Sequence, residues 1–164
     1  MKQYNKRWFL FGNRKDWSDP DFVPQFAIDR IKKIVPCHPE KERFIESTVD
    51  IEVYLKHVIG VSTNFHLQPQ NIILKFHPKR FDYVKTKPPH DLKMVDEDKK
   101  TIQIRVVHNK ELEQLILSFG ADVKVIKPDV LKNRIQEISE KMVGTYSTGE
   151  TEIKGNGDIE YKQN

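Results

Sequence analysis

The sequence contains almost no cysteine. Cys37 is the single cysteine among 164 residues, so a disulfide framework within the chain is impossible and a reducing compartment is the default. No apolar run approaches the roughly 18 residues that a membrane-spanning helix needs. The first residues, MKQYNKRWFLFG, also lack the apolar centre and cleavage site of a signal peptide. We therefore expect a cytoplasmic protein with no membrane partner.

Patterns typical of catalytic and metal sites are missing as well. The six histidines, at positions 38, 57, 66, 77, 90 and 108, form no H-x-x-x-H or H-E-x-x-H pair, and one cysteine cannot build a zinc ribbon. Cys37 and His38 are adjacent, but neighbouring side chains in a strand or turn point apart and do not form a nucleophile–base pair. Walker, G-x-G-x-x-G and G-x-S-x-G motifs are absent. The sequence thus predicts no enzyme, no metal site and no cofactor.

The charge of the chain is nearly balanced and selects no partner by itself. The 28 basic and 24 acidic residues give a formal net charge of +4. This balance allows an anionic partner, but a dedicated nucleic-acid arm would cluster its cations far more heavily. The length suits one ordinary domain or two small ones.

Residues 6–31 are the most distinctive stretch. Two aromatic-rich runs, RWFLF at 7–11 and FVPQFAI at 22–28, flank a polar, turn-prone insert. Aromatic and β-branched runs separated by Gly, Asn, Asp and Pro predict two strands that pair as a hairpin.

Alternation along the predicted strands assigns their faces. In the first strand, which we expect to span residues 4–11, Trp8 and Leu10 share a face without charge and are predicted to lie in the core. The second strand is predicted to continue to Val35, with a bend at Asp29. With Trp8 and Leu10 in the core, Phe9 and the arginines are predicted to face a ligand.

Basic and aromatic side chains alternate in this N-terminal region. Guanidinium and ammonium groups can track phosphates while flat rings stack on bases, as a single-stranded nucleic-acid surface requires. Alternatively, the rings form the core of a small β unit and the lysines are solvated. Two interpretations are also open for Arg30: it pairs with Asp29 or another acid to satisfy a half-buried position, or it clamps a phosphate or carboxylate.

The second half of the chain alternates between strand and helix patterns. Asp50 is predicted to begin a helix that Gly60 caps, and Asn109 is predicted to cap another. The order of the later elements, β-α-β-β-α-β-α, describes a ferredoxin-like α+β sandwich. From Thr145 onward the sequence is Gly-rich, charged and predicted to be largely disordered. The predicted divisions are a strand unit at 1–36, a connector with one helix at 37–71, the sandwich at 72–143 and a tail at 144–164.

Two groups of residues together resemble a known family. RWFL at 7–10, followed by FAIDRI at 26–31, resembles the WYL domain, which is named for a Trp-Tyr-Leu run and has a downstream F-x-L-D-R-I-like element. The stretches DIEVYLKHVIGV and NKELEQLILSFGADVKVIKPDVLKNRI resemble the C-terminal extension that follows WYL domains. The resemblance covers roughly residues 4–143, and its specificity comes from the order of the motifs.

The resemblance implies both a fold and a function. WYL domains are Sm-like small β-barrels that usually follow a winged helix-turn-helix in bacterial transcription regulators, where they sense nucleic acid or nucleotide-like ligands and commonly form dimers. This chain is then α+β, with a partial Sm-like small β-barrel followed by a ferredoxin-like sandwich, and a homodimer. The implied ligand-binding residues are Arg7, Phe9, Arg14 and Arg30. The alternative is a non-enzymatic oligomerisation or interaction fragment that has lost ligand binding.

The sequence departs from the family pattern at several places. Phe9 stands where the family has its middle Tyr, which removes a hydroxyl. Pro24 and Ala27 stand where further basic residues often occur, which leaves Arg30 as the main clamp. The helix-turn-helix and the first barrel strands are expected to be missing, with Met1 inside the domain. We expect the exposed edge to be covered by another chain or by local rearrangement.

Overall fold

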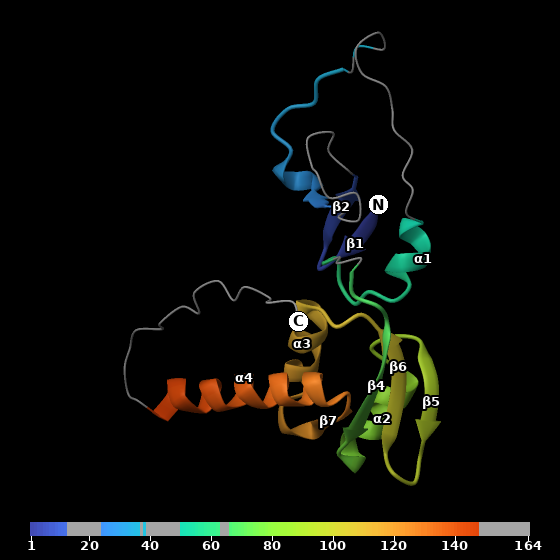
Figure 1. The fold of residues 1–164 in the computed structure, drawn as a ribbon, viewed down its shortest axis with the longest axis vertical. Coiled ribbons are helices and arrows are strands. Elements are labelled where there is room, and N and C mark those ends of the chain that lie inside the picture. Colours follow the sequence, from blue (N-terminus) through green and yellow to red (C-terminus); the bar gives the residue numbers. More distant parts are fainter. Residues whose placement is uncertain (13–23, 37, 39–49, 63–65, 148–164) are drawn as a thin grey trace.

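The computed structural model describes residues 1–12, 24–36, 38, 50–62 and 66–147 (Figure 1). These residues form two antiparallel sheets, one of three strands and one of four, together with four α-helices. The predicted α+β class is therefore confirmed.

The N-terminal sheet has the strand order β1-β2-β3. It consists of β1 (Lys2–Tyr4), β2 (Arg7–Phe11) and β3 (Gln25–Ala27). The antiparallel pairing of β2 with β3 confirms the predicted hairpin. The described strands form an open sheet and not a closed barrel.

Two strand predictions were wrong. The predicted strand at 4–11 is divided by a turn at Asn5 and Lys6, whose φ angles of 47° and 64° match the left-handed pair of a two-residue hairpin. The predicted continuation to Val35 is also absent. The chain leaves β3 as a 3-10 turn, η1 (Ile28–Arg30), and residues 31–36 form no strand.

The predicted burial of Trp8 and Leu10 was wrong as well. These side chains are 51% and 43% exposed, whereas Phe9 on the other face of β2 is half-buried. The face of Phe9 also carries Lys2, which lies directly opposite it on β1. The Lys2 Nζ donates to the carbonyl of Val58 over 2.9 Å, so this charged face is the one that meets the rest of the chain.

The connector contains one short helix, α1 (Ile51–Leu55). Its predicted start at Asp50 is confirmed, because Asp50 Oδ1 accepts from the backbone N–H groups of Glu52 and Val53, both over 3.1 Å. Gly60 does not cap this helix, which ends five residues earlier. Gly60 instead has a φ of 78° and passes closely over the side chain of Glu111.

The four-stranded sheet has the order β5-β6-β4-β7 with every neighbouring pair antiparallel. This order and the alternation of helices confirm the predicted ferredoxin-like topology. The elements are β4 (Gln70–Phe76), α2 (Pro78–Thr86), β5 (Leu92–Asp96), β6 (Thr101–Val106), α3 (Lys110–Ser118), the 3-10 turn η2 (Gly120–Asp122), β7 (Val123–Lys127) and α4 (Asp129–Ser147).

The core lies between one face of this sheet and the helices. Ile72 and Ile104 from the two central strands are fully buried against Phe81 of α2, Leu112 of α3 and Leu131 of α4. The predicted cap at the start of α3 is confirmed, because the Asn109 side chain accepts from the backbone N–H of Leu112 over 2.9 Å.

The last helix, α4, extends into the predicted tail. α4 continues to Ser147, so the predicted tail at 144 begins too early, and residues 148–164 lie outside the described residues. Among the helices of the described residues, none is long and apolar enough to cross a membrane.

Candidate functional site

The structure brings Arg7 of β2 and Asp29 of η1 into contact. Arg7 Nη2 lies 3.1 Å from Asp29 Oδ2, and the two side chains are 49% and 50% exposed. A half-exposed ion pair of this kind contributes at most about 1 kcal/mol to stability. Asp29 is therefore paired with Arg7 and not with the neighbouring Arg30.

The other predicted ligand residues differ in accessibility. Arg30 is exposed and has no ion-pair partner among the described residues. Phe9 shares the face of Arg7, directly opposite Ala27, and is half-buried. Arg14 lies outside the described residues. The structure thus gathers Arg7, Phe9 and Arg30 on neighbouring elements, with Arg30 the most accessible cation.

A cavity of about 510 Å³ that no sequence pattern predicted lies between β1, residues 55–60 of the connector and the loop before β5. Lys2 lies at its wall and donates to the Val58 carbonyl. Burial lowers the pKa of Lys2 below its ordinary value, while the Glu111 carboxylate acts in the opposite direction. The lining residues are Lys2, Tyr4, Leu55, Lys56, Val58, Ile59, Gly60, Pro88, Pro89, His90 and Asp91.

His90 is the second polar group of this cavity. Its Nδ1 is buried without a hydrogen-bond partner in the described part of the chain. Burial lowers the pKa of His90, an effect that the adjacent Asp91 carboxylate opposes. A neutral imidazole with one unused ring nitrogen can accept or donate a single hydrogen bond. Only the fold brings His90 near Lys2, since no local pattern marks either residue.

Two buried acids at the start of α3 fix the connector and the last helix. Glu111 Oε1 accepts from the backbone N–H of Val61 and from both the N–H and hydroxyl of Ser62, over 3.3, 3.0 and 2.7 Å. Glu113 lies 2.8 Å from His108 Nε2 and 3.5 Å from Arg134 Nε. These contacts make both acids structural.

The described residues contain no group of three or more His, Cys, Asp and Glu side chains arranged to hold a metal ion. The chemistry available near β1, β2 and η1 is therefore that of cations and aromatic rings.

Comparison with known proteins identifies the second half of the chain. Residues 68–143 match the family model of the WCX domain, the C-terminal extension of WYL proteins. This stretch is similar to WCX domains, and we refer to it as the WCX domain. The match covers the ferredoxin-like sheet and most of its helices, and it supports the predicted C-terminal part of a WYL-type regulator. A search of curated proteins found no match.

The presence of a WCX domain suggests a WYL-type regulatory protein, a class that is typically non-enzymatic. The N-terminal sheet precedes the matched residues in sequence. The sheet's place in front of a WCX domain agrees with its resemblance to the WYL domain.

Proposed function

We propose that this chain is the ligand-sensing portion of a bacterial WYL-type transcription regulator. It binds nucleic acid or a nucleotide-like anion through the basic and aromatic surface of β2 and η1. The observation that carries the proposal is the match to the WCX domain at residues 68–143, downstream of the RWFL and FAIDRI elements.

The side chains supply a simple binding chemistry. Arg7 is oriented by Asp29 through one nitrogen, and its half-exposed guanidinium keeps further donors for a phosphate. Arg30, which is exposed and unpaired within the described residues, adds a second cation from η1, the element that also carries Asp29. Phe9 offers a ring on the face of Arg7. Arg14, which lies outside the described residues, is proposed to contribute a further cation. Cations beside a ring suit a phosphate with its attached base.

The first prediction tests Arg30. A labelled single-stranded oligonucleotide is expected to bind wild-type protein at low salt and to weaken steeply as salt rises, because bound phosphates release counterions. Arg30→Ala is expected to weaken this binding by about tenfold, in line with the loss of one charge-assisted contact. Fluorescence anisotropy measures the affinity. The melting temperature is expected to stay unchanged, because Arg30 is exposed.

Lys79→Ala is the matched control for this variant. Lys79 is also exposed but lies on α2, away from the N-terminal sheet. An Arg30→Ala protein that binds as tightly as Lys79→Ala would contradict the proposal, and so would a wild-type protein that binds no oligonucleotide at low salt.

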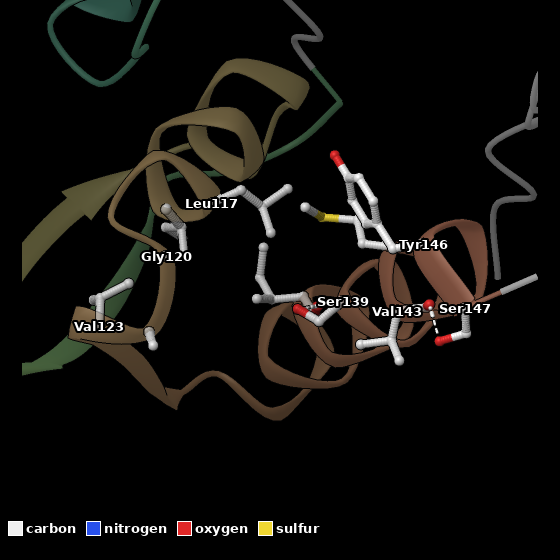
Figure 2. Close-up of a pocket in the computed structure, with 11 residues that line it drawn as sticks. Leu117, Gly120, Val123, Ser139, Val143, Tyr146 and Ser147 are labelled. Atoms are coloured by element: carbon white, nitrogen blue, oxygen red, sulfur yellow. Dashed lines mark hydrogen bonds between the residues drawn. The ribbon is translucent and has the colours of Figure 1, made fainter. Parts of the chain in front are cut away.

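A second candidate function is homodimerisation or protein interaction without ligand binding. It is favoured by an apolar groove of about 610 Å³ between the end of α3 and the C-terminal half of α4 (Figure 2). Leu117 enters this groove from α3, and Tyr146 and Val143 lie along α4. Val143 is 66% exposed, which leaves part of the groove open to a partner. Neither candidate function includes a chemical reaction.

The second prediction tests this groove. If it supports a homodimer, Val143→Glu is expected to raise the dimer dissociation constant by at least about tenfold, because a carboxylate would be buried against apolar side chains. Sedimentation equilibrium measures the constant, and Lys132→Glu on the exposed side of α4 serves as the control. A wild-type protein that remains monomeric at high concentration removes the dimer interpretation.

A further inference from the structure

One face of the WCX sheet is not covered by helices. The buried residues of β4 and β6, such as Leu74 and Ile104, pack against α2, α3 and α4 on the other face. The residues that alternate with them point away from the core, and none of them is buried. The strand register places them in rows across the sheet: Lys124, Lys75, Thr101 and Asp96; then Lys127, Ile73, Gln103 and Met94; then Asn71 and Arg105.

This open face carries four cations and a single acid, Asp96. β4, β6 and β7 contain no Asp or Glu, but they contribute Lys75, Arg105, Lys124 and Lys127, all exposed. Within the part of the chain that the structure describes, none of the four forms an ion pair. The acid at the end of β5, Asp96, is already paired with Lys99.

Several cations elsewhere in the same domain are compensated. They lie next to carboxylates on the helices and loops, as in the pairs Arg80–Asp122, Lys85–Glu97, Arg134–Glu113 and Lys141–Glu137. Other exposed lysines of the domain, such as Lys79 and Lys132, also form no ion pair within the described residues, so what distinguishes the open face is that four such cations gather on neighbouring strands.

Two lysines on this face are placed so that their charges repel each other. Lys75 and Lys124 are direct cross-strand partners on the same face. Like charges directly opposite on a sheet destabilise it, because their side chains lie close together. A bound anion would remove this repulsion. The uncompensated cations also combine into a positive potential that attracts an extended anion more strongly than a small one.

We propose that the open face of the WCX sheet contacts the phosphate backbone of a nucleic acid. The four cations would neutralise successive phosphates, and the side chains of Gln103, Asn71 and Thr101 would supply hydrogen bonds to phosphate or sugar oxygens. The rows contain no aromatic ring on which a base could stack. Binding here is therefore expected to depend little on base sequence. This surface is separate from the Arg7 and Arg30 surface of the N-terminal sheet.

The third prediction compares two double variants of the whole chain. Lys75→Gln/Lys124→Gln removes two charges from the open face, and Lys85→Gln/Lys141→Gln removes two from ion pairs on helices α2 and α4. The probe is a labelled oligothymidylate of about 20 nucleotides, which is longer than the roughly 4–16 nucleotides that a single OB-fold domain covers. The open-face variant is expected to bind about tenfold more weakly and to lose about 1.4 from the slope of log affinity against log salt, at roughly 0.7 per phosphate contact. The control variant is expected to bind within about twofold of wild type.

Three outcomes would overturn this assignment. They are an open-face variant that binds like wild type, an equal loss in both double variants, and binding to vesicles of anionic phospholipid without binding to the oligonucleotide. Equal loss would show an effect of net charge alone, and vesicle binding would assign the face to a membrane. Urea unfolding checks that both variants remain folded. An unaffected Arg30→Ala protein would contradict only the function proposed for the N-terminal sheet, so the two proposals fail separately.

Discussion

Glu111→Ala is expected to lower the free energy of unfolding by about 2–4 kcal/mol, because it leaves buried donors unpaired. Glu111 is only 8% exposed, and one oxygen accepts from Val61 and twice from Ser62. Hydrogen bonds to a charged acceptor contribute more than neutral ones, and Val61 is buried away from water. The measurement is urea unfolding, in which the midpoint should fall while the slope stays constant.

Loss of the Glu111 carboxylate is also expected to weaken the attachment of the connector to α3. Val61 and Ser62 belong to the segment that joins the N-terminal sheet to the WCX domain, and Asn109 adds hydrogen bonds to the carbonyls of Ile59 and Ser62. Glu111→Gln keeps one acceptor oxygen and is expected to cost less than alanine. Glu140→Ala on the exposed side of α4 is the control, with an expected change within about 0.5 kcal/mol. If Glu111→Ala costs no more than Glu140→Ala, its carboxylate does not stabilise the connector.

Phe81→Ala is expected to be the most damaging single change, at about 3–5 kcal/mol of unfolding free energy. Phe81 is 1% exposed and lies among the buried side chains that join α2 to the sheet. Its removal loses the transfer free energy of a ring and leaves a cavity that the close-packed neighbours cannot fill. The ring also lies 5.3 Å from Lys100 Nζ, and the variant loses this cation–π contact.

Tyr83→Ala on the same helix provides the comparison. Tyr83 is 53% exposed, so its replacement is expected to cost about 1 kcal/mol or less. Thermal unfolding followed by circular dichroism separates the two variants. Similar melting temperatures for them would show that α2 does not pack on the sheet through Phe81.

Local signals in the sequence were sufficient for much of the WCX domain. A short apolar run at 72–76 predicted β4, alternating apolar residues predicted β6, and Asn109 predicted the start of α3. These signals depend on a few neighbouring residues, because strand alternation and helix capping are short-range effects. They also predicted the order of elements, from which the ferredoxin-like topology follows.

The candidate ligand site was less predictable. The sequence marked Arg7, Phe9 and Arg30, but it did not show that Asp29 pairs with Arg7 instead of Arg30. It also missed Lys2 of β1 and His90 of the loop before β5, which line one cavity only in the folded chain. Contacts between residues far apart in sequence have no local pattern, so only their burial and geometry reveal them.

The sequence by itself determined the α+β class, the order of the elements in the WCX domain and the start of several helices. The tertiary structure decided which face of the N-terminal sheet is buried, and it exposed Trp8 and Leu10. Alternation identifies two faces of a strand but cannot say which one another part of the chain will cover. The tertiary structure also decided that the cations of the WCX sheet share one open face. Lys75 and Lys124 are neighbours because of the register between strands, and not because of their spacing in the sequence.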